Sequence, residues 1–364
     1  MIAERVFIGL YSGPAADGVD AALVAVKGGR ERPKVRTDAH LHAPFEQSLR
    51  QAILDASVGR PGGGSWPSPA ELAALDARLG EAFANAAVEV VKKAGVEMKS
   101  VAAIGWSGQV IGQAEPDGGR PGSAVELGQH GIISLMTSRP VIADMLRDHL
   151  AGGRTGSPTD TAAWRLLRDK RLSRVLVHLG GLARVTFIGA DSHESDVVAF
   201  DAGPCGLVLD ALAVKLLQRP VDADGAAAAQ GKPCGEFLDE LLSHPYFRRA
   251  APMLADMSDW GPVYIERLGL MARKHGCEDK PATILATVVE MIARSIAGAI
   301  AGLTERPHEV ILSGGGALHI RLAGRIRALM SPSSTVSVEK FGLPLRATQA
   351  AFVAMLAHGR LRRH

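Results

Sequence analysis

Short apolar runs on either side of glycine turns form the first pattern along this chain. Residues 6–10 and 21–26 are apolar runs that flank a glycine-containing turn, which is the signature of a β-hairpin. The arrangement returns in the second half, where runs at residues 174–178 and 184–188 flank Gly180-Gly181. Further strands are predicted at residues 35–40, 101–104, 197–200 and 309–312. Because each half opens with antiparallel strands around a glycine turn and then adds helices, the sequence predicts a weak internal repeat.

Helical spacing of apolar residues fills the intervals between these strands. The longest helix is predicted at residues 69–94, with Ser68 as its N-cap and Glu71 at capping-box spacing. The most apolar long stretch, residues 282–303, carries an oppositely charged pair four positions apart, so a buried amphipathic helix is predicted rather than a membrane span. Other helices are predicted at residues 44–56, from 207 onward, at 318–330 and at 345–358, the last packing back on the first half, and a loop rich in Gly, Pro and Ser is predicted at residues 60–69.

Length, charge and cysteine content argue against several classes of protein. The chain has 364 residues, which suits two domains, and its net charge of 41 − 38 = +3 is too small to indicate nucleic-acid binding. The basic end, residues 360–363, is typical of a solvated terminus. Cys205, Cys234 and Cys277 show no metal-binding spacing and fit a reducing cytoplasm, with Cys205 expected to be a small buried filler. No signal peptide is recognisable, so we expect a cytoplasmic protein that binds neither membranes nor nucleic acid.

Two acidic glycine loops carry the candidate chemistry. Residues 12–18 and residues 201–206 each follow an apolar run and combine a glycine turn with a carboxylate. A glycine turn lets backbone N–H groups close on a phosphate, and a carboxylate binds Mg²⁺ or accepts a proton. A third glycine segment, residues 313–317, lies between a strand and a helix, an arrangement that faces adenosine or phosphate. Taken alone, any one of these loops is more often a simple tight turn.

Taken together and in order, these segments resemble the anhydro-N-acetylmuramic acid kinases, within the superfamily of sugar kinases, heat-shock chaperone ATPases and actin. The first loop follows the opening phosphate loop of that family at Ser12-Gly13 and at residues 17–24. The further matching segments, which extend over nearly the whole chain, are residues 140–144, 151–153 and 179–183, then Asp201, Gly203 and Pro204, then Asp222, Asp224-Gly225 and residues 229–231, and finally residues 244–247 and 314–317. Each match is weak by itself, and their shared order makes the resemblance strong.

The resemblance implies an α/β protein of two domains with the actin-like ATPase (ribonuclease H-like) fold and a deep interdomain cleft. The first domain is expected at residues 1–145, with 340–364 packing back on it, and the second at 146–339. The implied activity is that of an ATP-dependent sugar kinase with Mg²⁺ as cofactor. It phosphorylates O6 of 1,6-anhydro-N-acetylmuramic acid while water opens the anhydro ring, a step of peptidoglycan recycling, and members commonly form homodimers.

Residue roles follow from the matched positions. Water attack at an anomeric carbon needs a base, and Asp201 matches the catalytic aspartate of the family. Asp17 is expected to hold Mg²⁺, directly or through water. Backbone groups of the phosphate-binding segments are expected to come from Ser12, Gly13, Gly18, Gly180, Gly181 and Gly203. Gly314, Gly315 and Gly316 are expected to line the adenosine pocket, and Gln109 and Asp144 to bind the sugar.

Substitutions are concentrated at the same motifs. Pro14 and Ala15 replace a Thr-Ser pair, which removes two hydroxyls and one N–H donor from the first loop. The other substituted positions are Ser107 and Val110 around Gln109, Met145 and Leu146 after Asp144, His178 and Arg184 in place of two asparagines, Ala202, Cys205 and Gly206 in the second loop, and Arg346 and Gln349 near the C-terminus, while residues 251–257 have no good match. Arg184 either replaces a lost phosphate donor or forms an ion pair that fills an empty site.

Two interpretations therefore stay open. The first is a divergent kinase with altered sugar recognition. The second is a catalytically degenerate homologue that binds nucleotide or sugar without turnover, because each lost donor aimed at developing charge lowers the rate by about 10²–10³-fold. A purely structural or interaction protein is a third class, and the glycine-rich turns that follow three predicted strands argue against it.

Overall fold

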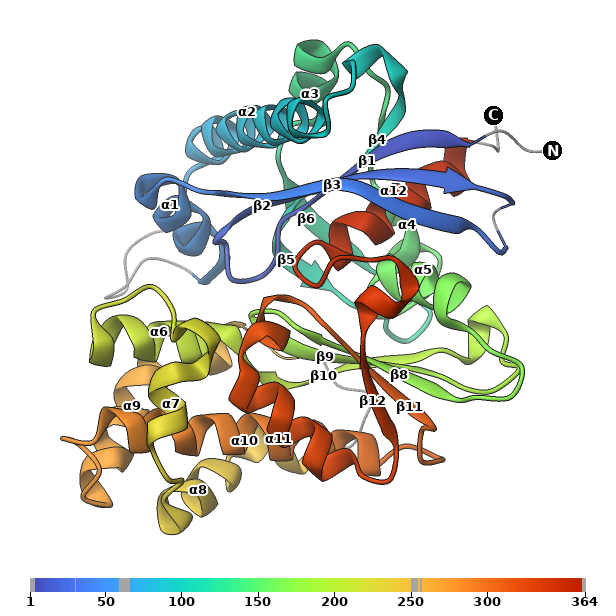
Figure 1. Ribbon diagram of the computed structural model, residues 1–364. Helices are drawn as coiled ribbons and strands as arrows, with labels where there is room; N and C mark the ends of the chain where they lie inside the picture. The colour runs from blue at the N-terminus through green and yellow to red at the C-terminus, as the bar shows by residue number, and fades with distance from the viewer. Residues whose placement is uncertain (1–3, 30, 59–65, 250–254, 256, 362–364) are drawn as a thin grey trace. The chain divides into compact units, whose positions relative to one another are not determined.

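The computed structural model describes residues 4–29, 31–58, 66–249, 255 and 257–361. The chain forms two compact units, Met1–Leu167 with Val338–His364, and Arg168–Ser337 (Figure 1). Residues 146–167, which the predicted domain division assigns to the second domain, belong to the first of these units. Most of the predicted loop at 60–69 and the basic residues Arg362 and Arg363 lie outside the described residues.

The first unit is an α/β fold built on one five-stranded sheet, with a separate two-stranded hairpin. Its strands are β1 (Arg5–Tyr11), β2 (Gly18–Lys27), β3 (Lys34–Pro44), β4 (Val101–Ser107), β5 (Gln109–Ala114), β6 (Ser123–Leu127) and β7 (Val141–Ile142). Its helices are α1 (Gln47–Val58), α2 (Pro69–Ala94), α3 (His130–Thr137), α4 (Met145–Ala151), α5 (Pro158–Leu167) and α12 (Thr348–Leu361). Helix α2 has the predicted bounds, and Ser68 and Glu71 form the predicted capping box.

The second unit repeats this plan. Its strands are β8 (Arg174–Leu179), β9 (Leu182–Ile188), β10 (Val198–Pro204), β11 (Glu309–Ser313) and β12 (Ser334–Ser337). Its helices are α6 (Gly206–Leu217), α7 (Ala226–Gln230), α8 (Gly235–Leu242), α9 (Pro262–Lys274), α10 (Pro281–Ala301) and α11 (Ile320–Met330). Short 3₁₀ turns at Ala223–Gly225, Pro245–Arg248 and Gly315–Leu318 connect them.

The two sheets have the same strand order and the same strand directions. The orders are β3-β2-β1-β4-β7 in the first unit and β10-β9-β8-β11-β12 in the second. In each sheet the first three strands of the unit are antiparallel neighbours, and the two later strands are added in parallel. The predicted internal repeat is therefore confirmed as a repeat of topology.

Helix α12 returns to the first unit and packs on strands β1, β2 and β4, as the sequence predicts (Figure 1). Glycines make this approach possible. A Cβ atom added to Gly9 on β1 would lie 1.7 Å from the carbonyl oxygen of Ala350, and one on Gly105 would lie 2.6 Å from that of Val353. The helix backbone therefore rests directly on the strand backbones, while α2 contributes Leu79, Phe83 and other apolar residues to a separate core cluster with β1 and β2.

Helix α10 forms the centre of the second core. Among the described residues it is the one helix long and apolar enough to cross a membrane, yet 72% of its apolar window is buried inside the protein. Glu290 on this helix binds Arg294 at 2.7 Å and Arg325 of α11 at 2.6 Å. The predicted buried helix with a charged pair is confirmed.

Two predicted boundaries in the second unit are wrong. Strand β10 does not end at residue 200 but continues through Asp201 to Pro204, with a bulge between Asp201 and Gly203. Helix α11 begins at Ile320 rather than at residue 318, because residues 315–318 form a 3₁₀ turn and His319 caps the helix through Nδ1. The β5–β6 hairpin and strands β7 and β12 were not predicted.

We predict that Gly9→Ala destabilises the first unit by about 3 kcal/mol, because the new methyl group overlaps the Ala350 carbonyl and pushes α12 off the sheet. Urea denaturation followed by circular dichroism measures the loss. Gly112→Ala is the matched control, since a Cβ at this strand position meets nothing within 4 Å. Equal stability of the two variants would contradict the direct packing of α12 on β1.

Candidate functional site

The turn between β1 and β2 holds the first acidic glycine loop. The N–H of Ala16 donates to the carbonyl of Gly13 at 3.1 Å, and Pro14 occupies the second position of this four-residue turn, where the fixed φ of proline is favoured. Gly18 opens β2, and a Cβ there would lie 2.3 Å from the carbonyl oxygen of Ala43. The Pro14-Ala15 substitution is thus compatible with a closed turn, although it removes donor groups.

Ser12 and Gln109 meet at the base of this loop. The buried Ser12 hydroxyl lies 2.9 Å from the carbonyl oxygen of Gly18 and 2.7 Å from Oε1 of Gln109, and it donates its proton to one of them. The side-chain amide of Gln109 donates to the carbonyls of Gly13 and Val110 at 3.4 and 3.2 Å. The structure therefore brings together Ser12, Gly13, Gly18 and Gln109 and uses their polar groups to tie β5 to the loop.

Asp17 projects from the same turn as an exposed side chain. Next to it, Nδ1 of His42 on β3 lies 2.9 Å from Oδ1 of Asp20 on β2, and this hydrogen bond raises the pKa of His42. Among the described residues no group of three or more His, Cys, Asp or Glu side chains is placed to hold a metal ion. A lone exposed carboxylate still fits Mg²⁺, which is usually held by one or two carboxylates, water and substrate phosphates.

Asp144, the other predicted sugar ligand, lies at the start of α4 in the left-handed region with φ of 54°. Its Oδ1 is 3.3 Å from Nη1 of Arg147, one turn along the helix. Arg147 also donates through Nε to the carbonyl of Ala124 on β6 at 3.1 Å. Beneath this pair lies Glu126, a buried carboxyl that was not predicted and whose only signal in the sequence is a charged residue inside a short apolar run.

The three glycine segments of the second unit converge at one end of β8 and β11. The carbonyl of Gly180 accepts the N–H of Gly206 at 2.9 Å, and the carbonyl of Gly181 accepts those of Cys205 and Leu207 at 2.9 and 3.0 Å. A Cβ on Gly314, whose φ is 85°, would lie 2.5 Å from the carbonyl oxygen of Leu179. The predicted phosphate and adenosine segments are therefore neighbours, but the first N–H groups of α6 are bound by the hairpin turn.

Gly315 and Gly316 complete this glycine cluster. A Cβ on Gly315 would meet nothing within 4 Å, whereas one on Gly316 would lie 2.9 Å from Cβ of Leu179 and 3.4 Å from Sγ of Cys205. Cys205 is fully buried, and burial raises the pKa of its thiol to about 12, so the sulfur is neutral and the filler role predicted for it is confirmed.

Asp201 lies in the bulged part of β10, with 7% of its surface exposed. Its Oδ1 is 3.2 Å from Nη1 of Arg184, the residue directly opposite on β9, and its Oδ2 accepts the N–H of Ala255 at 3.0 Å. Its carbonyl accepts the hydroxyl of Tyr246 at 2.7 Å. Of the two roles left open for Arg184, the structure shows the ion pair.

An aromatic cluster packs against the bulged part of β10. The rings of Tyr246 and Tyr264 lie edge-on to Trp260, with centroids 5.3 and 4.9 Å away. Phe247 closes on Gly203, where an added Cβ would lie 2.9 Å from the ring, and the φ of Gly203 is 136°. Only glycine suits this position, and the packing fixes the backbone that carries Asp201.

Residues 222–231, which follow α6 and carry matches to the family, form a turn and the short helix α7 that it caps. The carboxylate of Asp222 accepts the N–H groups of Ala227 and Ala228 at 2.8 and 3.0 Å, which caps α7. Gly225 has a φ of 72°, and an added Cβ would lie 2.4 Å from the ring of His319 at the start of α11. The Asp222 turn therefore packs against the same end of α11 as the glycine cluster.

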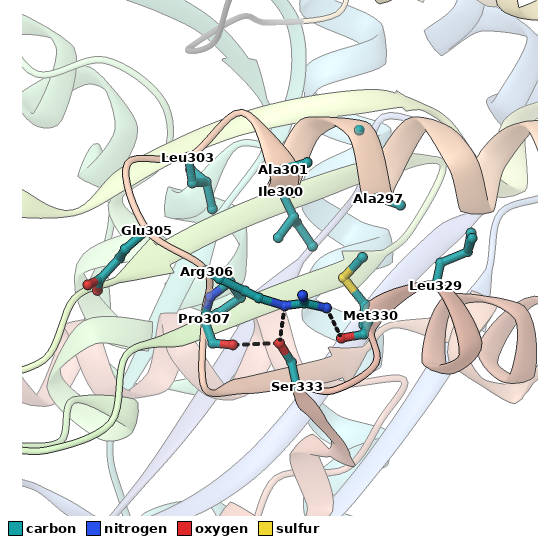
Figure 2. Close-up of a pocket in the computed structure, with 11 residues that line it drawn as sticks. Ala297, Ile300, Ala301, Leu303, Glu305, Arg306, Pro307, Leu329, Met330 and Ser333 are labelled. Atoms are coloured by element: carbon teal, nitrogen blue, oxygen red, sulfur yellow. Dashed lines mark hydrogen bonds between the residues drawn. The ribbon is translucent and has the colours of Figure 1, made fainter.

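Two surface hollows lie away from these groups. One of about 520 Å³ is bounded by the C-terminal parts of α10 and α11, where Arg306 donates to Ser333 and to the carbonyl of Met330 (Figure 2). It is at the opposite end of α11 from Gly314–Gly316, so it is not the predicted adenosine pocket. The other, about 490 Å³, lies in the first unit between residues 116–121 and Ala151-Gly152-Gly153, a segment that matches the family.

Comparison with known proteins decides the family. The sequence profile described as anhydro-N-acetylmuramic acid kinase matches residues 5–364. The chain belongs to this family. The anhydro-N-acetylmuramic acid kinases of Gloeobacter violaceus and Salinibacter ruber are each 32% identical to it, and the alignments cover 96% and 98% of this chain and 90% of each relative.

Solved structures confirm the fold class. Component A of the (R)-2-hydroxyglutaryl-CoA dehydratase of Acidaminococcus fermentans aligns with a TM-score of 0.50 at 13% identity, over 99% of this chain and 100% of that chain. At 13% identity this structural similarity supports a shared fold and nothing about function. Together with the repeated sheet topology, it confirms that this anhydro-N-acetylmuramic acid kinase family member has the predicted two-domain α/β fold of the actin-like ATPases.

We predict that Gly314→Ala destabilises the second unit by about 2–3 kcal/mol, because alanine is strained at a φ of 85° and its methyl group overlaps the Leu179 carbonyl. Thermal unfolding of the purified variants measures this. Gly315→Ala, one residue along, meets nothing within 4 Å and is expected to unfold at the wild-type temperature. A stable Gly314→Ala protein would show that the cluster does not need this backbone contact.

Proposed function

We propose that this protein is an ATP-dependent kinase of 1,6-anhydro-N-acetylmuramic acid that opens the anhydro ring with water and phosphorylates O6. The observation that carries the proposal is Asp201, held on a bulged strand beside the glycine cluster in a chain that matches the family from residue 5 to residue 364. The two relatives cited above are named anhydro-N-acetylmuramic acid kinase, and their alignments cover 96% and 98% of this chain.

Asp201 supplies the general base. Water becomes nucleophilic toward the anomeric carbon when a carboxylate accepts its proton, and the bond from the anomeric carbon to the bridging oxygen breaks as the new bond forms. Arg184 and the N–H of Ala255 hold the two carboxylate oxygens, so the side chain has a defined orientation.

The glycine segments bind the nucleotide. We assign Gly314, Gly315 and Gly316 to the adenosine side, and the segments at Gly13, Gly18, Gly180, Gly181 and Gly203 to the phosphates. Asp17 would hold Mg²⁺ together with phosphate oxygens and water, and the ion would neutralise charge on the transferred phosphoryl group. Gln109 and Asp144 bind the sugar. The interdomain cleft, the domain borders, a homodimer and a cytoplasmic location stay predictions from the resemblance.

The retained geometry favours turnover over binding alone. Gly203, Gly225 and Gly314 have positive φ angles. A Cβ added to them would meet the Phe247 ring, the His319 ring and the Leu179 carbonyl, respectively. Tyr246 and its aromatic neighbours hold Asp201 in place. A protein that merely binds a ligand has no need to fix a buried carboxylate in this way, so the degenerate alternative is the less favoured one.

The proposal is tested by incubating the purified protein with Mg-ATP and the anhydro sugar and detecting the phosphosugar by mass spectrometry. We predict that Asp201→Asn lowers kcat by about 10²–10⁴-fold, because the amide cannot accept the proton of the attacking water. Asp239→Asn, an exposed position on α8, is the control and keeps wild-type kcat.

Full activity of Asp201→Asn would overturn the base assignment. Absence of phosphosugar with the wild-type protein at high enzyme concentration would overturn the kinase activity. If calorimetry then still showed Mg²⁺-dependent ATP binding, the degenerate homologue would be the correct description.

A further inference from the structure

Glu126 is a buried carboxyl group in the first unit that none of the roles above uses. It lies on β6 with 6% of its surface exposed, opposite Val110 of β5. The N–H of Gly108 donates to its carboxyl group. Its Oε2 atom is fully buried and has no hydrogen-bond partner among the residues that the structure describes. A buried oxygen without a partner is costly, and more so when the group is charged.

The neighbours of Glu126 belong to the predicted sugar site. Gly108 directly precedes Gln109. On the other side, α4 presents Arg147, Asp144 and Asp148 to it, and Arg147 binds both the carbonyl of Ala124 on β6 and the carboxylate of Asp144. The carboxylate of Asp148 is bound by Arg360 at 2.7 Å. On α2, Asp76 binds the N–H of Gly128, two residues beyond Glu126. Glu126 is thus hydrogen-bonded to the residue before Gln109 and interacts electrostatically with Asp144.

The charge state of Glu126 is finely balanced. Burial raises the pKa of its carboxyl to about 7, and the carboxylates of Asp144 and Asp148 act in the same direction. Arg147 and the N–H of Gly108 act against this rise. Near neutral pH the group therefore exchanges its proton.

We propose that Glu126 is a positioning residue for the sugar site, and that its proton decides whether Arg147 pairs with Asp144 or with Glu126. With Glu126 neutral, Arg147 holds Asp144 as the structure shows. Once Glu126 loses its proton, an unpartnered buried charge attracts Arg147 and draws it away from Asp144. Asp144 then loses its orientation, and the sugar binds less tightly. This inference rests on the proposed function, because it takes Asp144 and Gln109 as sugar ligands.

The first test is the KM for the anhydro sugar between pH 6 and pH 8 at saturating Mg-ATP. We predict that the wild-type KM rises about ten-fold over this range, as expected for one group that titrates near 7 and binds only when protonated. Glu126→Gln keeps the acceptor for the Gly108 N–H but cannot ionise, so its KM stays low and flat. A rise that persists in Glu126→Gln, or a flat wild-type profile, overturns the proposal.

Arg147→Met separates positioning from folding. Without the guanidinium, Asp144 has lost its partner at every pH, so the KM at pH 6 is expected to approach the wild-type value at pH 8. Glu97→Gln removes an exposed carboxylate from the same unit and is expected to show the wild-type profile. A wild-type KM in Arg147→Met at pH 6 would overturn the switch.

Thermal unfolding supplies a readout that needs no turnover. Between about pH 4.5 and pH 7 the folded protein holds the Glu126 proton more tightly than the unfolded chain does, so stability falls as pH rises. The melting temperature of wild type is expected to fall, relative to that of Glu126→Gln, between pH 5 and pH 8. If the melting temperatures diverge but no phosphosugar forms, the proposed kinase function is wrong, whereas the titration of Glu126 in the folded protein is supported. If they do not diverge, the proposal for Glu126 fails.

Discussion

Direct contact between backbones at a few glycines is the constraint on which both units depend. Gly9 and Gly105 let α12 rest on the first sheet, and Gly314 and Gly206 bring the third glycine segment and the start of α6 against the end of β8. A Cβ at Gly9, Gly105 or Gly314 would overlap the facing backbone, and one at Gly206 would be tight against the Gly180 carbonyl. Gln109 follows Gly105 by four residues, and Asp201 precedes Gly206 by five, so these two polar side chains lie close in sequence to such contacts.

Two of the residues that depart from the family pattern, Arg184 and His178, have polar partners in the same unit. Arg184 pairs with Asp201, and His178, at the other asparagine position, lies 3.1 Å from the hydroxyl of Ser313 on the neighbouring strand. Ser12, which has lost its hydroxyl-bearing neighbours, turns toward Gln109. These contacts satisfy buried polar atoms within each unit. Buried polar groups in a folded protein are paired in this way because an unpaired one is costly.

Much of the architecture follows from the sequence because local signals suffice for it. The two glycine hairpins, the capped helix α2, the buried helix α10 and the return of the last helix are predicted from apolar spacing and capping residues. The end of β10 is not, because Gly203 and Pro204 are signals for a loop. Here they lie on an edge strand, where a bulge tolerates glycine and the missing proline N–H leaves no ladder bond unmade. Arg184 lies opposite Asp201 because β9 and β10 pair in this register. A strand predicted to end at residue 200 leaves Asp201 outside the pairing, so the contact could not be predicted.

The two buried carboxyl groups show what the sequence leaves undetermined about the chemistry. Asp201 and Glu126 each lie on a strand, each bind a backbone N–H, and each are nearly inaccessible to solvent. Their environments differ in the partners of the carboxyl group. Arg184 is bonded to Asp201, whereas Arg147 binds Asp144, Oε2 of Glu126 has no partner among the described residues, and the carboxylates of Asp144 and Asp148 act on Glu126. Burial, together with the carboxylates of Asp144 and Asp148, raises the pKa of Glu126 and so favours its neutral form. The partners of each carboxyl group, rather than burial alone, therefore distinguish the two roles that we propose for them.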